Sequence, residues 1–143
     1  MTYTRTDERT KTMNAFYQVF LFLENKEDFD ATKVLCDQYG KTDVADVPVF
    51  SQAVYALGLE HFDAIKATLS SYLVGWTFDR LDNVAKAILF EAVSEGAYGK
   101  LAPRKVVISQ AVLLAKNYLK EGDHRFINAV LDKAIPAYDF ASK

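Results

Sequence analysis

Apolar residues recur along most of the chain at the three- and four-residue spacing of an α-helix, and the few β-branched runs are too short or too poorly bounded to predict strands. The first apolar stripe, which predicts a helix over about residues 9–24, consists of Met13, Phe16, Tyr17, Phe20 and Leu23. Further helices are predicted at about 28–39, 46–57, 60–73, 79–97 and 104–120, and a last helix is expected to follow its N-cap, Asp123. The pattern therefore predicts an all-α fold, a compact bundle of about seven helices.

Glycines mark several of the predicted helix boundaries. Gly40 is expected to end the second helix, and Gly58 is expected to be the hinge between the third and fourth helices. The fourth helix is expected to carry Trp76 on the same side as Ile65 and Leu69, which faces the core. At 143 residues, half of them hydrophobic, the chain predicts a single domain with a sizeable core.

Composition excludes several classes of protein. Cys36 is the only cysteine, so no internal disulfide is possible, and two isolated histidines with one thiol do not form a zinc-site pattern. No metal or cofactor is therefore expected. The N-terminus lacks the apolar region of a signal peptide, and no run approaches the ~18 apolar residues of a membrane span. The sequence predicts a soluble, cytoplasmic protein.

Charge is distributed unevenly, although the net charge is only −2. The stretch from Glu24 to Asp46 is acidic, whereas the stretch from Gly96 to Lys120 contains no acid. The basic residues of this second stretch are Lys100, Arg104, Lys105, Lys116 and Lys120, and the N-terminal arm adds Arg5, Arg9 and Lys11. A local positive surface is therefore predicted despite the negative total, and the basic residues of the arm are partly offset by Asp7 and Glu8.

The sequence gives little support to catalysis. A glycine-rich phosphate loop and a Gly-x-Ser-x-Gly elbow are both absent. His61 and His124 are expected to be surface or helix-end histidines, and Cys36 a small buried hydrophobe. Glu91 and Glu95 lie one helical turn apart and are expected to form a solvated face rather than an acid–base pair. A function without catalysis is therefore expected.

Two apolar residues fall on helix faces that are otherwise polar. Phe90 shares a face with Asn83 and Lys86, and Leu113 shares a face with Lys116. Each is a candidate anchor for a partner. The alternative is that neighbouring helices cover them, as happens to many single apolar residues.

Three consecutive segments of the C-terminal half resemble the NusB family of bacterial transcription antitermination factors. They read "VAKAILFEAVSE", "LAPRKVVISQAVLLAKNY" and "GDHRFINAVLDKAIP", and "FINAVLDK" resembles the family's Phe-(Val/Ile)-Asn-Gly-Val-Leu-Asp signature. The resemblance covers about residues 72–136. It is weaker in the N-terminal half, where "RTKTMNAFYQ" resembles the family's opening helix after its arginine-rich arm.

The resemblance implies two packed helical subdomains, here about residues 1–75 and 76–143, and a function without catalysis. NusB proteins pair with NusE, a small-subunit ribosomal protein, and the pair binds the boxA element of nascent RNA. The complex then supports read-through by RNA polymerase, notably in ribosomal RNA operons. The same activities and partners are therefore expected of this chain.

The resemblance also suggests site residues. Arg5 and Arg9 match arginines of the family's arm, and Lys86 matches a lysine on the helix that contacts the ribosomal partner. The residues expected to bind RNA, by phosphate contact or by stacking of an aromatic ring, are Arg5, Arg9, Lys11, Tyr17, Lys116, Lys120, Arg125 and Phe126. The residues expected to bind a protein partner are Lys86, Phe90 and Leu113.

The chain also departs from the family. Ser109 and Gln110 replace the Asn and Glu of an "INEA" motif, Phe90 replaces a common arginine, and Leu113 replaces a common glutamate. An alternative is therefore a protein–protein adaptor or homodimer that uses Phe90 and Leu113 instead of RNA contacts. Asn128 interrupts the apolar pattern of the last helix, and a buried amide that fixes the docking of this helix is favoured over an RNA contact.

Overall fold

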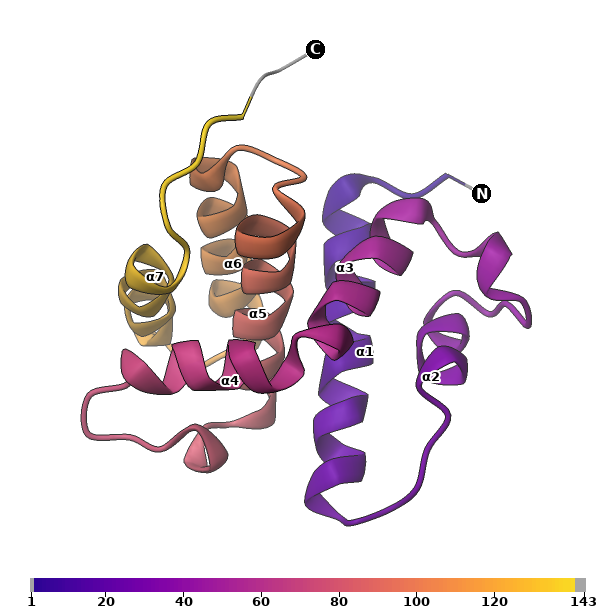
Figure 1. The fold of residues 1–143 in the computed structure, drawn as a ribbon, viewed down its shortest axis with the longest axis horizontal. Coiled ribbons are helices and arrows are strands. Elements are labelled where there is room, and N and C mark those ends of the chain that lie inside the picture. Colours follow the sequence, from indigo (N-terminus) through magenta and orange to yellow (C-terminus); the bar gives the residue numbers. More distant parts are fainter. Residues whose placement is uncertain (1, 141–143) are drawn as a thin grey trace.

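The computed structural model describes residues 2–140, which contain seven α-helices and no strand (Figure 1). The helices are α1 (Arg5–Glu24), α2 (Ala31–Gln38), α3 (Val49–Glu60), α4 (Phe62–Ser71), α5 (Asn83–Val93), α6 (Arg104–Tyr118) and α7 (Asp123–Ala134). Short 3-10 turns lie at Val44–Asp46 and Phe78–Arg80, and a π-helical segment, Ser94–Gly99, follows α5. The all-α prediction with seven helices is confirmed.

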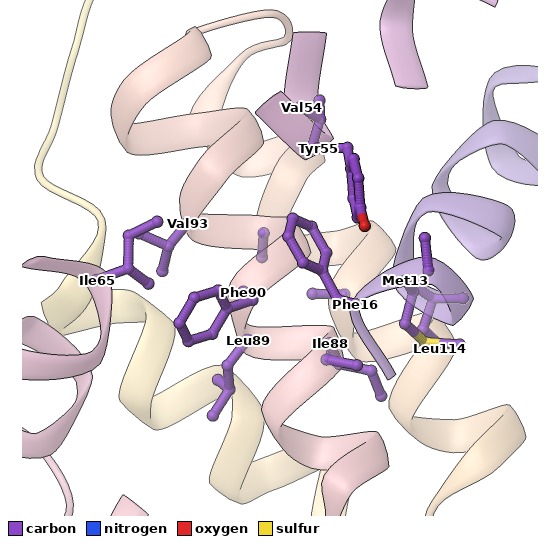
Figure 2. Packing of buried hydrophobic residues seen from close by; sticks show 14 of the residues in the cluster. Met13, Phe16, Val54, Tyr55, Ile65, Ile88, Leu89, Phe90, Val93 and Leu114 are labelled. Atoms are coloured by element: carbon purple, nitrogen blue, oxygen red, sulfur yellow. The ribbon is translucent and has the colours of Figure 1, made fainter. Parts of the chain in front are cut away.

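Helix α5 lies at the centre of the molecule. In Figure 1, α1, α2 and α3 lie on one side of it, α6 and α7 lie on the other, and α4 extends from the end of α3 toward α7. Every residue from Ala85 to Val93 is buried, so α5 has no outward face. Figure 2 shows Phe16 of α1, Tyr55 of α3 and Phe90 of α5 close together in the core, which is continuous across both groups of helices.

The predicted exposure of Phe90 is wrong, because the residue is completely buried. The rings that lie with their centres 4.9 to 5.9 Å from that of Phe90 belong to Phe16, Phe20, Phe62 and Phe78. They come from α1, α4 and the turn at Phe78–Arg80, which cover the side of α5 that a two-faced helix would expose to water. Phe90 is therefore a core residue.

The hinge between α3 and α4 lies at His61, not at Gly58 as predicted. His61 stacks on Tyr98 of the π-helical segment, with ring centres 4.2 Å apart and planes 19° apart. Gly58 lies inside α3, where a Cβ atom would come within 2.7 Å of Ser94 Oγ and even nearer to the ring of Phe16. The glycine is thus required for close packing of α3 against α1, and not for a bend.

The ends of two helices also differ from the prediction. Helix α4 ends at Ser71, so Trp76 lies in the following loop and is 58% exposed instead of facing the core. Helix α7 begins at Asp123 itself, and its N-cap is Gly122, whose φ of +93° suits glycine. Asn128 is exposed on α7, so the predicted buried amide is wrong and its side chain faces solvent.

Candidate nucleic-acid interface

The first turn of α1 places Arg5 on the surface. The Asp7 N–H donates to Thr4 Oγ1 and the Thr4 N–H donates to Asp7 Oδ2, both at 3.0 Å, which fixes the start of the helix. The bond from the Thr4 N–H to the Asp7 carboxylate is the largest cause that holds the pKa of Asp7 below its ordinary value. Arg5 Nε donates to Glu8 Oε1 at 3.0 Å, and its guanidinium lies 4.2 Å from the centre of the Phe50 ring. Half of the Arg5 side chain remains exposed, so it can still contact a phosphate.

Arg9 does not face solvent, which corrects its prediction as an RNA contact. Its side chain is only 6% exposed, and it donates two bonds to Glu95, from Nε to Oε1 at 2.9 Å and from Nη2 to Oε2 at 2.7 Å. Burial disfavours the charged guanidinium, but the hydrogen bonds and charge of Glu95 hold the pKa of Arg9 above its ordinary value. The pair joins α1 to the π-helical segment inside the protein.

Glu91 and Glu95 are buried, so the predicted solvated face is wrong. Glu91 is 1% exposed, and neither of its carboxyl oxygens has a hydrogen-bond partner among the described residues. Burial, followed by the nearby charge of Glu95, raises the pKa of Glu91 well above its ordinary value. Burial therefore favours the neutral form of the Glu91 carboxyl group in the folded protein.

Two further predicted RNA contacts on α1 are half-buried. Lys11 Nζ donates to the backbone carbonyl of Gln38 at 3.0 Å and lies 5.4 Å from the centre of the Tyr39 ring. This ammonium is therefore directed toward α2. Tyr17 packs partly against the core and keeps part of its surface exposed. Of the charged residues predicted on α1, Arg5 has the most accessible side chain.

The basic residues of α6 and α7 are more accessible. Lys116, Lys120 and Arg125 are all exposed, and none forms an ion pair with another residue of the range 2–140. Phe126 is half-buried beside them. We call the exposed side chains of Lys116, Lys120 and Arg125 the α6–α7 cations. Cations without a carboxylate partner are available to phosphate groups.

A groove adjoins these cations. It has a volume of about 480 Å³ and is lined by Trp76, Arg80, Leu81, Asp82, Ala85, Tyr118, Leu119, Lys120, Asp123 and Phe126. Sequence reasoning did not assign Trp76, Arg80 or Tyr118 to a site. The available signal was Gly75, a glycine directly before Trp76 that interrupts the helical pattern and has a φ of +78° in the loop after α4.

The structure does not gather all the predicted RNA contacts in one place. Helices α1 and α6 run in the same direction beside α5, and Thr6 Oγ1 donates to Gln110 Oε1 at 3.2 Å between them (Figure 1). Lys116 lies six residues after Gln110, about 9 Å further along α6 at 1.5 Å per residue. Arg5 instead extends toward Phe50 of α3. Arg5 thus contacts α3, whereas Lys116 lies in the last turn of α6.

The predicted partner residues are also dispersed. Lys86 is only 8% exposed, so it does not lie on an open helix face as predicted. Its Nζ donates to the Asp79 carbonyl at 3.3 Å and lies 5.5 Å from the centre of the Phe78 ring. Leu113 is 41% exposed on α6. With Phe90 in the core, Leu113 is the predicted anchor that a partner could reach.

Neither a membrane span nor a metal cluster occurs within residues 2–140. No helix in this range is both long and apolar enough to cross a membrane. The range also contains no group of three or more His, Cys, Asp or Glu side chains that could hold a metal ion.

Comparison with known proteins places these features in a family. The model of the NusB family matches residues 6–136. The transcription antitermination protein NusB of Bacillus subtilis is 40% identical over 84 residues, which are 59% of this chain and 63% of that protein. NusB of a Cyanothece species is 42% identical over 87 residues, which are 61% of this chain and 41% of that protein. The aligned part of the chain thus spans less than two thirds of these relatives.

Solved structures agree with the sequence matches. NusB of T. maritima superposes with a TM-score of 0.77 at 25% identity, over 94% of this chain and 92% of that one. NusB crystallised with NusE and double-stranded RNA superposes with a TM-score of 0.73 over 91% of this chain and 94% of that one, and its 20% identity supports the fold alone. Because the family model covers nearly the whole chain, the protein belongs to the NusB family.

Proposed function

We propose that this protein is a transcription antitermination factor that binds boxA-type single-stranded RNA together with NusE. In this role it would join the RNA polymerase elongation complex and support read-through in ribosomal RNA operons. The observation that carries the proposal is the set of α6–α7 cations, which are exposed and without ion-pair partners within residues 2–140 of a NusB-family chain. Support also comes from the relatives named as antitermination proteins and from a fold neighbour crystallised with NusE and RNA.

The mechanism we propose is electrostatic attraction combined with stacking. Arg5 and the α6–α7 cations contact phosphates, while Tyr17 or Phe126 offers a ring to a base. Four phosphate contacts predict that log K falls with log salt concentration with a slope of about −2.8, at about 0.7 for each contact to single-stranded RNA. Arg9 is excluded from this count because its guanidinium is bound to Glu95.

The proposed role is non-enzymatic and belongs to the cytoplasm, where nascent bacterial RNA is made. It requires surfaces that hold RNA and protein together, and no bond is made or broken. The alternative of a protein adaptor or homodimer depended on Phe90 and Leu113 acting together. Because Phe90 is buried, no second observation supports this alternative.

Fluorescence anisotropy with a labelled boxA-type RNA, with and without NusE, tests the proposal. The double variant Lys116→Ala/Arg125→Ala should bind more weakly, and its salt slope should be smaller by about 1.4 because two phosphate contacts are lost. Lys41→Ala is the matched control, because Lys41 is exposed but lies in the acidic segment between α2 and α3. Absence of RNA binding by the wild type, with NusE and without it, would refute the proposal.

A further inference from the structure

The groove beside the α6–α7 cations has unusually exposed aromatic walls. Trp76, in the loop between α4 and α5, is 58% exposed, and Tyr118, at the end of α6, is 51% exposed. Both line the groove of about 480 Å³, together with the half-buried Phe126. Large aromatic side chains are usually buried, and two exposed in one groove indicate a contact surface.

The lining of this groove contains two basic and two acidic side chains. The two basic ones, Arg80 and Lys120, have no ion-pair partner within residues 2–140. Of the two acids in the lining, Asp82 is engaged as the N-cap of α5, where it accepts a bond from the Val84 N–H at 2.7 Å. Asp123 lies in the first turn of α7, where the helix dipole stabilises a carboxylate.

We infer that this groove receives an unpaired base of single-stranded RNA, which stacks on the indole of Trp76 while Arg80 and Lys120 contact the adjoining phosphates. Combined aromatic faces and cations are how single strands are bound, because each nucleotide presents both a flat base and a phosphate. A duplex fits less well, since its bases are already stacked on one another. The volume also lies within the ~300 to 1,000 Å³ typical of sites for small ligands.

The inference rests on the proposed function, because it assigns a place and a contact chemistry to the RNA binding proposed above. The groove and the α6–α7 cations share Lys120, and Arg125 directly precedes Phe126 of the lining, so a strand that leaves the groove can continue along these two cations. A protein side chain could also fill an aromatic groove. The unpaired cations at its edge nevertheless favour a polyanion, so a protein occupant is treated as one outcome of the test.

Trp76 is the only tryptophan of the chain, so its emission reports the state of the groove directly. Adding a single-stranded boxA-type RNA to the intact protein should quench this emission at the concentrations at which anisotropy detects binding. Trp76→Ala should weaken binding roughly 5- to 150-fold, as loss of one stacked base does, while the salt slope stays that of the wild type. Trp76→Phe should restore most of the affinity because a flat ring is retained.

The matched control is Tyr72→Ala, which removes an aromatic ring that is 38% exposed between α4 and Trp76 but outside the groove. Wild-type RNA affinity in Trp76→Ala would overturn the inference and leave the proposed function intact. Quenching by NusE alone would also overturn it, because the groove would then bind protein. If the wild type binds no RNA under any condition, the proposed function itself fails. Circular dichroism of each variant confirms that the helices are retained.

Discussion

Replacing Glu91 by leucine should stabilise the protein, and the gain should increase with pH. The carboxyl group of Glu91 is 1% exposed and has no hydrogen-bond partner within the described residues. The neighbouring carboxylate of Glu95 is already bound to Arg9 by two hydrogen bonds. Leucine has a similar size and suits the apolar surroundings of α5, so the substitution removes the unsatisfied group and leaves the Arg9–Glu95 pair in place.

The size of the effect follows from proton linkage. Burial, and then the charge of Glu95, raises the pKa of Glu91 well above its ordinary value of 4.5 in the folded protein. Between the unfolded and the folded pKa, the native state holds a proton that the unfolded chain has lost. The proton on Glu91 therefore stabilises the wild-type protein fully below the unfolded pKa. This stabilisation falls by about 1.4 kcal/mol for each pH unit between the unfolded and the folded pKa. Leucine carries no proton, so this dependence disappears.

Urea unfolding at pH values of about 5.5, 6.5 and 7.5 measures both parts of the effect. At the lowest pH the variant should gain about 1 to 3 kcal/mol from removal of the unsatisfied polar group. The gain should then grow with pH, by at most about 1.4 kcal/mol per pH unit while the pH lies below the folded pKa of Glu91. Glu27→Leu is the control, because Glu27 is exposed after α1. A gain that is constant across this range would refute the buried proton. A loss of stability would show that the carboxyl makes a favourable native contact.

Five further substitutions test the packing and the exposure of individual side chains. Arg9→Ala should lower the free energy of unfolding by about 3 to 5 kcal/mol because it leaves Glu95 buried and unpaired. The control Arg5→Ala should lower it by less than about 1 kcal/mol, because Arg5 forms an exposed ion pair. Equal losses in the two variants would contradict the burial of Arg9. Phe90→Ala should cost about 3 to 5 kcal/mol in calorimetry by leaving a core cavity, and near-wild-type stability would contradict its central position. Gly58→Ala should lower the free energy of unfolding by about 1 to 3 kcal/mol because the added methyl group overpacks against Phe16. An unchanged Tm would show that α1 can shift to accommodate the methyl group. Leu113→Asp should change the free energy of unfolding by no more than about 0.5 kcal/mol, because Leu113 is exposed. The mass measured by light scattering should equal that of the wild type. A mass below that of the wild type would identify α6 as an interface between copies of the chain.

Helical periodicity predicted the number of helices because each peripheral helix has one apolar stripe and one polar side. The same rule failed for α5, which other elements surround on every side. Lys86, Phe90 and Glu91 were therefore assigned to exposed faces although all three are buried. A charged residue in a helical pattern normally indicates a solvent-exposed face. The pattern does not reveal that the Lys86 ammonium donates to a carbonyl oxygen and lies over two aromatic rings inside the protein.

Glycine was similarly ambiguous at the sequence level. A glycine between two apolar stripes can allow a bend or allow another element to approach closely, and both leave the same pattern. At Gly58 the structure shows close approach, because the Phe16 ring occupies the space that a side chain would need. Gly75 instead lies in the loop after α4, which ends at Ser71, and its positive φ suits a loop conformation. The sequence pattern therefore could not predict that Trp76 lies exposed in the loop and lines the groove.

The contrast between Arg5 and Arg9 bears most directly on function. They lie one helical turn apart on α1, yet the Arg5 side chain is 50% exposed and that of Arg9 is 6% exposed. The difference arises from Glu95, which lies 86 positions away in the sequence and is brought to Arg9 by the π-helical segment after α5. A basic residue of the arm can thus stabilise the fold and be unavailable to RNA. Substitutions of the α6–α7 cations should therefore reduce the salt dependence of RNA binding. Substitution of Arg9 should weaken RNA binding only by lowering the stability of the protein.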